Sequence, residues 1–133
     1  MKEKLVSLLE NAYCPYSKFP VSSIVVMNDG TEFSGVNVED ASTHAGICAE
    51  RNAITTAITK GYKKGDFKEI HVLTSSDGVG TCCGVCRQLI GEFFDKESFV
   101  YCYSKSGEMK KFTVKELLPY SFNESDLRWK VAL

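Results

Sequence analysis

Apolar residues near the start of the chain recur with the period of a helix. One helical face is formed at positions i, i+3, i+4 and i+7 by Leu5, Leu8, Leu9 and Ala12. Pro15 follows and ends that helix. A β-hairpin is predicted next, because an apolar, β-branched segment (residues 21–27) and residues 31–36 flank the turn sequence Asn28-Asp29-Gly30.

Helices and strands alternate through the rest of the chain. Residues 49–60 are rich in Ala and Ile at helical spacing, and Gly61 supplies a C-cap. Residues 70–74 form a short apolar run that is typical of a buried strand. The glycine-containing residues 75–81 are predicted to be a loop.

A further helix is predicted over residues 83–94, with one apolar face formed by Val85, Leu89, Ile90 and Phe93. The remaining pattern predicts strands over 99–103 and 112–114 and a short helix over 114–118 that Pro119 stops. Strands that alternate with helices indicate an α/β layered fold with a mixed sheet. Because 133 residues can bury one core and no linker or repeat interrupts them, we expect a single domain over residues 1–133.

The composition is that of an ordinary globular protein, with 44% hydrophobic and 25% charged residues. A net charge of −1, without a basic tract or acidic tail, argues against a nucleic-acid or membrane partner. No apolar run approaches the roughly 20 residues that span a bilayer, and the first ten residues lack the apolar core of a signal peptide. We therefore expect a cytoplasmic protein that acts on a small molecule.

Six cysteines allow either three disulfides or metal and redox chemistry. Thiols stay reduced in the cytoplasm, and Cys82, Cys83 and Cys86 lie close together in the sequence, so metal or redox chemistry is favoured.

Three of the cysteines have the spacing of a zinc site that leaves one tetrahedral position open for water: Cys48, Cys83 and Cys86. Cys48 begins one predicted helix, and the pair Cys83 and Cys86 begins another. The positive end of each helix dipole favours the thiolate form of these cysteines. Glu50 can shuttle the water's proton if Cys48 lies in the first helical turn and the site lies across that helix end. Arg51 is placed to offset thiolate charge by hydrogen bonding to a ligand sulfur.

A structural zinc site remains an alternative, in which a fourth protein ligand closes the coordination sphere. The candidates for that ligand are His44, Cys82, Cys14 and Cys102. The Cys-x-Glu element at the start of the other helix favours a catalytic site over this alternative.

These residues resemble the small, homotetrameric, zinc-dependent cytidine deaminases of pyrimidine salvage, whose pattern combines an x-Glu element with Cys-x-x-Cys. Further segments resemble the family in the same order, namely residues 15–19, 35–41, 48–53, 84–88 and 117–127. The resemblance implies a three-layer α/β/α fold with a mixed, mostly five-stranded sheet. It also implies one zinc ion per subunit and active sites at the subunit contacts of a homotetramer.

The resemblance also implies roles for individual residues. Zinc would be bound by Cys48, Cys83 and Cys86, and Glu50 would be the acid/base. The substrate would be contacted by Asn37 and Glu39 at the ribose hydroxyls, Phe19 at the pyrimidine, the backbone around Ala49 at the base edge, and Phe122 from a neighbouring subunit. Taken alone, Asn37 and Glu39 are more typical of an ordinary polar turn than of a binding site, and Phe19 and Phe122 are more typical of a core than of ligand contacts.

The implied reaction is hydrolysis of cytidine and 2′-deoxycytidine to uridine and 2′-deoxyuridine, with release of ammonia. Zinc-activated water attacks C4, and Glu50 moves the protons. The alternatives are a deaminase of a modified cytosine nucleoside, of the blasticidin type, and, from another class, a structural zinc or thiol-redox protein.

The chain departs from the family pattern at three places. Cys82 replaces the usual proline before the first of the paired cysteines. Thr43-His44 stands where an aromatic residue is usual, and Ser22-Ser23-Ile24 stands where the family has Gly-Ala-Ala. We expect His44 and His71 to be structural.

Overall fold

The protein is described by a computed structural model, in which residues 1–127 are placed. Its elements in chain order are α1 (Lys2–Leu9), β1 (Val21–Met27), β2 (Glu32–Val36), α2 (Ala49–Thr59), β3 (Phe67–Thr74), α3 (Gly84–Phe93), β4 (Phe94–Ser104), β5 (Met109–Thr113), α4 (Val114–Leu117) and the 3₁₀ helix η1 (Glu124–Leu127). Within this described part, no helix combines the length and the apolar character that crossing a membrane requires.

The five strands form one mixed sheet in the order β2-β1-β3-β4-β5. β1 pairs antiparallel with β2 and with β3, and β5 pairs antiparallel with β4, whereas β3 and β4 are parallel. α3 forms the crossover that a parallel pair requires. The predicted hairpin is confirmed, with a register that pairs Ser22 with Val36.

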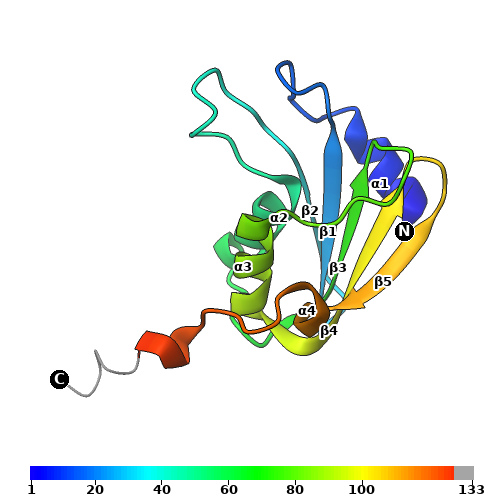
Figure 1. The fold of residues 1–133 in the computed structure, drawn as a ribbon. Helices are drawn as coiled ribbons and strands as arrows, with labels where there is room; N and C mark the ends of the chain where they lie inside the picture. Colours follow the sequence, from blue (N-terminus) through cyan, green and yellow to red (C-terminus); the bar gives the residue numbers. More distant parts are fainter. Residues whose placement is uncertain (128–133) are drawn as a thin grey trace.

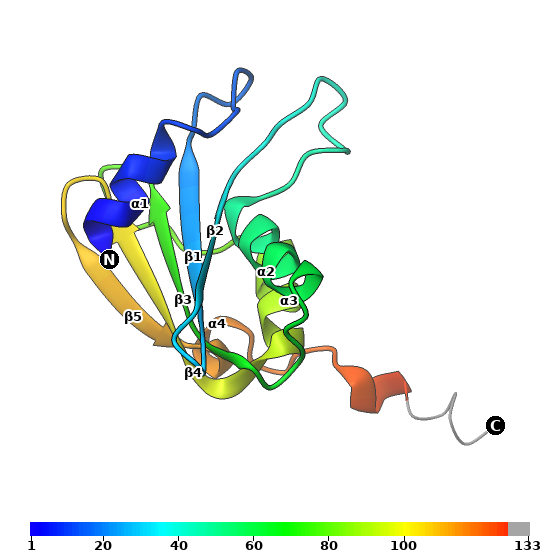
Figure 2. The same cartoon turned by 180° about the vertical axis from the view of Figure 1, so that it is seen from behind.

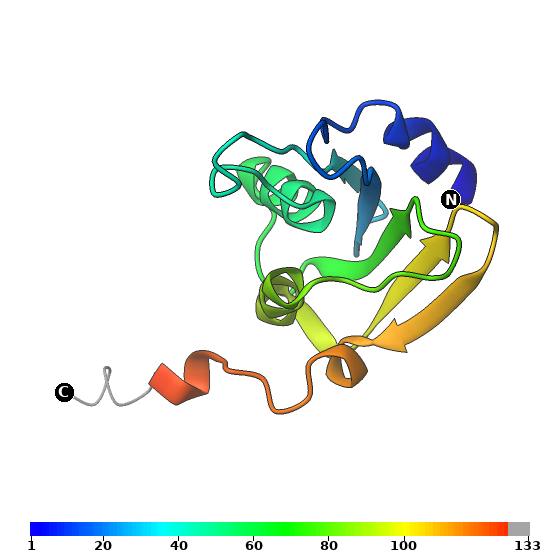
Figure 3. The same ribbon diagram turned by 45° about the horizontal axis from the view of Figure 1, so that its top comes forward.

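Helices cover both faces of the sheet, so the molecule has the expected three layers (Figures 1 and 3). α1 packs on one face, and α2 and α3 pack on the other. The larger core lies under α2 and α3 and includes Ile54, Ile70 and Ile90. The smaller core lies under α1 and is formed by Leu5, Ile24, Leu73 and Tyr103.

The inner face of α3 differs from the prediction. Its buried residues are Cys86 and Ile90, an i, i+4 pair, whereas Val85 is 61% exposed. Cysteine packs as a small apolar residue, so Cys86 takes the core position that Val85 was expected to fill. β4 also begins five residues before the predicted strand, because Phe94 at once packs against Phe67 of β3, with ring centroids 5.1 Å apart.

The two serines that replace small apolar residues of the family pattern are buried and hydrogen-bonded. Ser22 Oγ donates to the carbonyl of Leu5 at 2.7 Å, and Ser23 Oγ donates to the carbonyl of His71 at 2.8 Å. Buried hydroxyls cost little stability when they are satisfied in this way. These serines tie α1 and β3 to β1 rather than altering the site.

Two long connections, residues 10–20 and 37–48, extend beyond the same end of the sheet (Figure 2). Backbone bridges join Tyr13 to Val38 and Val38 to Ile47. The second connection leads directly into α2. It therefore brings irregular backbone next to the start of that helix.

Candidate metal centre and active site

Two helix starts bring three cysteines together. Cys48 is the N-cap of α2 and Cys83 is the N-cap of α3, both with extended backbone, and Cys86 lies in the first turns of α3. Their sulfur atoms all lie within 4.8 Å of one another, and Cys48 Sγ is 3.8 Å from Cys83 Sγ. Residues that are 35 positions apart in the sequence thus face each other across the two helix ends.

This donor set fits a zinc ion with an open position. Thiolates bound at about 2.3 Å in a tetrahedron lie roughly 3.8 Å apart, which is the separation of Cys48 and Cys83. Among residues 1–127, no fourth His, Cys, Asp or Glu joins the group, so the four-ligand alternatives with His44, Cys82, Cys14 or Cys102 are not formed. All six cysteines, each of which is described, are free, so the disulfide alternative is not formed either.

Among the three clustered cysteines, Cys48 is the one that ionises most readily. Hydrogen bonding from the Cys86 thiol lowers the pKa of Cys48 to about 5, against the opposing effect of burial. Arg51 adds to this effect, because its Nη2 donates to Cys48 Sγ at 3.4 Å. The pKa of Cys86 is raised by the same thiol–thiol hydrogen bond and by burial. Cys48 is therefore the thiolate of the cluster at neutral pH, and Arg51 lies beside it as a countercharge.

Glu50 lies in the first turn of α2 with only 4% of its surface exposed. Burial raises the pKa of its carboxyl group, and the negative charge of Cys48 raises it further. The thiols of Cys82 and Cys86 hydrogen-bond to the carboxylate and oppose this rise. A carboxyl group whose pKa is raised is suited both to accept a proton and to return it.

A glycine allows α2 to approach the sheet closely at this point. A Cβ at Gly35 of β2 would lie 2.6 Å from both the carbonyl oxygen of Ala49 and the amide nitrogen of Ala53. Asn52 Nδ2 also donates to the carbonyl of Val36 at 3.1 Å. Backbone contact and hydrogen bonding therefore fix the first turn of α2, which carries Glu50.

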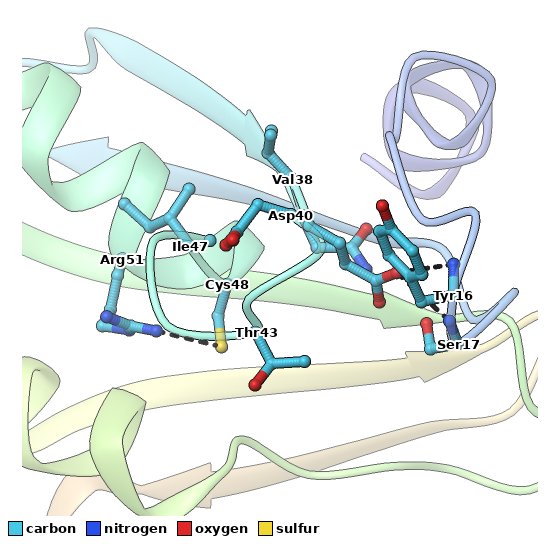
Figure 4. A pocket seen from close by; sticks show the side chains of 11 residues that line it. Tyr16, Ser17, Val38, Asp40, Thr43, Ile47, Cys48 and Arg51 are labelled. Atoms are coloured by element: carbon cyan, nitrogen blue, oxygen red, sulfur yellow. Dashed lines mark hydrogen bonds between the residues drawn. The ribbon is translucent and has the colours of Figure 1, made fainter.

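A pocket of about 330 Å³ opens beside Cys48, with Arg51 near the same end and Tyr16 and Ser17 at the other (Figure 4). Its volume suits a small organic ligand. The wall between these ends comes from residues of the second connection, including Val38, Asp40 and Ile47.

The predicted ribose-binding residues line this pocket and also hold its rim. Asn37 Oδ1 accepts the amide of Val21 at 2.9 Å, and its Nδ2 donates to the carbonyl of Phe19 at 2.9 Å. Glu39 Oε1 accepts the amides of Tyr16 and Ser17, each at 3.1 Å. Hydrogen bonds from the Ser17 side chain and backbone lower the pKa of Glu39, so its carboxylate is charged. The role of both residues toward a ribose stays a prediction.

The other predicted contacts do not line the pocket. Ala49 is buried at the start of α2, and Phe19 is exposed on the first connection. Phe122 is 59% exposed on the C-terminal segment, which passes α3 and then runs away from the body of the domain (Figure 1). The structure therefore does not bring Phe122 to the pocket of its own chain.

Several lining residues were assigned no role from the sequence, although residues 16 and 40 lie in segments that resemble the family. Tyr16, Asp40 and Ile47 belong to irregular connections, where neither helical nor strand periodicity marks an inward-facing position. Asp40 Oδ1 accepts the amide of Ser42 at 2.8 Å, and Thr43 adopts a left-handed conformation with φ of 64°. Such a φ is rare for a β-branched residue, and sequence periodicity does not reveal it.

Comparison with known proteins places the chain in a family. A family model described as the cytidine and deoxycytidylate deaminase zinc-binding region matches residues 1–102. A cytidine deaminase from Sporosarcina psychrophila is 38% identical over 120 residues, covering 90% of this chain and 87% of the relative. A probable cytidine deaminase from Dictyostelium discoideum is 40% identical over 130 residues, covering 94% and 86%.

Solved structures agree with the sequence relatives. A crystal structure of cytidine deaminase from Burkholderia pseudomallei matches with a TM-score of 0.87 at 38% identity, covering 90% of this chain and 94% of that one.

Among the sequence relatives, a blasticidin-S deaminase from Bacillus cereus is more distant, at 29% identity over 131 residues. The matched model covers most of the chain and ends after the two helix starts that carry Cys48, Cys83 and Cys86. The chain therefore belongs to the family of cytidine and deoxycytidylate deaminases that share this zinc-binding region.

Proposed function

We propose that this chain is a cytidine deaminase, which hydrolyses cytidine and 2′-deoxycytidine to the uridine forms and releases ammonia. The observation that carries the proposal is the position of Glu50. Its buried carboxyl group, with a raised pKa, lies beside three cysteine sulfurs within 4.8 Å of one another. Membership of the deaminase family supports the same activity.

Cys48, Cys83 and Cys86 would hold the zinc ion. When bound there, zinc lowers the pKa of a coordinated water to about 7 and so supplies a nucleophile at neutral pH. Glu50 accepts the proton that the water loses and delivers it to N3 of the cytosine as C4 becomes tetrahedral. Glu50 then takes the remaining proton from the hydroxyl group added at C4 and passes it to the 4-amino group. The C4–N bond breaks, ammonia leaves and the C4 carbonyl of the uridine form results.

The remaining residues bind and orient the nucleoside. Arg51 offsets thiolate charge through its hydrogen bond to Cys48. Asn37 and Glu39 would hydrogen-bond the ribose hydroxyls, which is supported by their place on the pocket wall. Phe19 would pack on the pyrimidine, and the backbone around Ala49 would read the base edge.

We further propose that residues 1–133 form a single domain that assembles into a homotetramer and serves pyrimidine salvage in the cytoplasm. The exposure of Phe122 supports the assembly, because the side chain is free to enter a neighbouring subunit's pocket. Gln88 Nε2 donates to the Phe122 carbonyl at 2.8 Å and holds that segment against α3. Sedimentation velocity should give a tetramer, and an active, stable monomer would contradict the role of Phe122.

The activity is tested by following ultraviolet absorbance on zinc-loaded protein with cytidine, 2′-deoxycytidine, cytosine and deoxycytidine monophosphate. Both nucleosides should be deaminated with release of ammonia. A fifth substrate, blasticidin S, tests the alternative that the relative from Bacillus cereus suggests. Release of ammonia from blasticidin S but from neither nucleoside would replace the proposal with that alternative.

A further inference from the structure

We propose that Arg87 is a positioning residue of the metal centre, which fixes the peptide units on both sides of the ligand Cys83. The proposal rests on Cys83 being a zinc ligand, as in the proposed function. Arg87 contacts the main chain around the ligand rather than the sulfur atoms or the pocket.

The side chain of Arg87 makes three hydrogen bonds, each 2.8 Å long, in three directions. Nε donates to the carbonyl of Cys82, Nη1 donates to the carbonyl of Leu117, and Nη2 donates to Oγ1 of Thr81. The planar guanidinium holds its donors in a fixed fork, so three acceptors in this arrangement define the position of the group. Arg87 thus joins the two residues that precede Cys83 to the end of α4.

The backbone of Arg87 completes the arrangement. Its amide donates to the carbonyl of Cys83 at 2.9 Å, as part of the first turn of α3. The carbonyls of Cys82 and Cys83 are therefore both held by one residue. These carbonyls belong to the two peptide units that flank the Cα atom of Cys83. When both units are held, the direction of the Cys83 Cα–Cβ bond is fixed as well.

This part of the site has little packing to hold it. Thr81, Cys83, Gly84 and Val85 are all exposed, and only Cys82 is buried in this stretch. Cys82 has no ring to restrict its φ angle, as a proline would. Hydrogen bonds to Arg87 and burial of the Cys82 side chain take over that restriction.

The far anchor, the end of α4, is itself well fixed. α4 begins with a capping box, in which Thr113 and Glu116 satisfy each other's backbone amides. α3 and the residue after α4 approach so closely that a Cβ at Gly91 would lie 2.9 Å from Leu118 Cδ2. The Leu117 carbonyl is thus a stationary acceptor for Arg87 rather than a mobile chain end.

Groups that orient metal ligands typically change metal affinity by about 10–100-fold when they are removed. We therefore expect Arg87→Met to release zinc to a chelator about 10–100-fold faster than the unchanged protein. Arg87→Lys keeps the charge but has a single donor nitrogen in place of the guanidinium fork, so its rate of zinc release should fall between the other two. Thr81→Val removes one of the three acceptors from an exposed position and should speed release by about threefold, since one exposed hydrogen bond contributes roughly 0.6 kcal/mol.

Leu5→Ala is the matched control, because Leu5 is fully buried on the opposite face of the sheet. It should lower the melting temperature without changing the rate of zinc release. If Arg87→Met lowers the melting temperature equally with and without zinc and releases zinc at the rate of the unchanged protein, Arg87 is only a fold-stabilising residue and the proposal fails.

Should Arg87→Met not fold, Thr81→Val decides the question, since an unchanged release rate in that variant would also overturn the proposal. Zinc release is measured without nucleoside. The result therefore stands whether or not the protein deaminates cytidine.

Discussion

The two helix starts that form the metal centre present the same element, an N-cap cysteine, in opposite surroundings. At the start of α2, Ala49, Glu50 and Ala53 are buried against the sheet, and Gly35 brings β2 into backbone contact. At the start of α3, Cys83 and Val85 are exposed, and hydrogen bonds from Arg87 hold the segment. The start of α2 is held mainly by packing, with one hydrogen bond from Asn52, whereas the start of α3 is held mainly by the hydrogen bonds of Arg87.

This difference matches the tasks of the two halves. Burial raises the pKa of a carboxyl group, and Glu50 is buried in the first turn of α2, where that helix closely approaches β2. In the proposed mechanism, the packed half carries the proton transfer. The exposed start of α3 would supply two of the three metal ligands, Cys83 and Cys86, while the pocket opens beside Cys48 at the start of α2.

The largest effect should follow from changing the proton carrier in the packed half. Glu50→Gln preserves the shape of the side chain but removes its ability to accept a proton, so kcat should fall by about 10²–10⁴-fold. Zinc content, measured by atomic absorption, should remain one per chain. Glu92→Gln, near the C-terminal end of α3 where the residue is half-buried, is the control and should keep full activity. A near-normal kcat for Glu50→Gln would remove Glu50 from the mechanism.

The next largest effect, on zinc binding, distinguishes a metal ligand from a neighbouring thiol at the start of α3. Cys86→Ser should weaken zinc binding by more than about 100-fold, because a hydroxyl does not provide the thiolate that the ion prefers. The control is Cys82→Ala in the same segment. Its thiol belongs to the core rather than to the sulfur cluster, so zinc should remain bound. Loss of zinc from Cys82→Ala, with retention in Cys86→Ser, would reassign the ligand.

Sequence patterns predicted the layers of the fold and the metal cluster because both follow local rules. Periodicity placed the helices that carry Cys48 and Cys86, and spacing selected the three ligands. Periodicity was wrong about Val85, since apolar character alone does not distinguish it from Cys86 on the same helix. The substrate side was harder, because its wall is built from two irregular connections that meet through tertiary contacts. These contacts include the pairing of Tyr13 with Val38 and the hydrogen bonds of Asn37 and Glu39.

The role of Arg87 shows a second limit. Its three acceptors are two main-chain carbonyls and one hydroxyl, and Leu117 lies thirty residues away in the sequence. Main-chain acceptors carry no side-chain signal, so no spacing rule selects them. The positive charge of Arg87 by itself is equally typical of a solvated helix surface.

A smaller effect on stability and kcat is expected from disturbing the packing of α2 on β2 while leaving the proposed catalytic residue unchanged. Gly35→Ala would place a Cβ 2.6 Å from the backbone of α2, so the helix start must shift. We expect a loss of about 1–3 kcal/mol in the free energy of unfolding, measured by urea denaturation. We also expect kcat to fall about tenfold as Glu50 moves from its position. Gly78→Ala, where a Cβ meets nothing within 4 Å, is the control. Equal activity in both variants would show that α2 tolerates displacement.

The finest test compares the thiols themselves in metal-free protein, by pH-dependent alkylation with the labelled residue located by mass spectrometry. Cys48 has its pKa lowered to about 5 by hydrogen bonding from Cys86 and by Arg51, so its labelling rate should rise as pH increases through 5 and level off by neutrality. Cys86 has a raised pKa and should stay unlabelled over the same range. Since the folded pKa of Cys48 lies below its unfolded value, the same ionisation stabilises the fold at neutral pH, and this stability is lost as pH falls through 5.

Arg51→Gln removes one of the groups that lower the pKa, so the midpoint for Cys48 should move upward. Lys60→Gln, at the far end of the same helix, should leave it unchanged. A Cys48 midpoint near the ordinary thiol value in the unchanged protein would mean that the packed half does not hold a preformed thiolate. In that case the two helix starts would differ in rigidity alone, and zinc itself would have to displace the proton from every ligand.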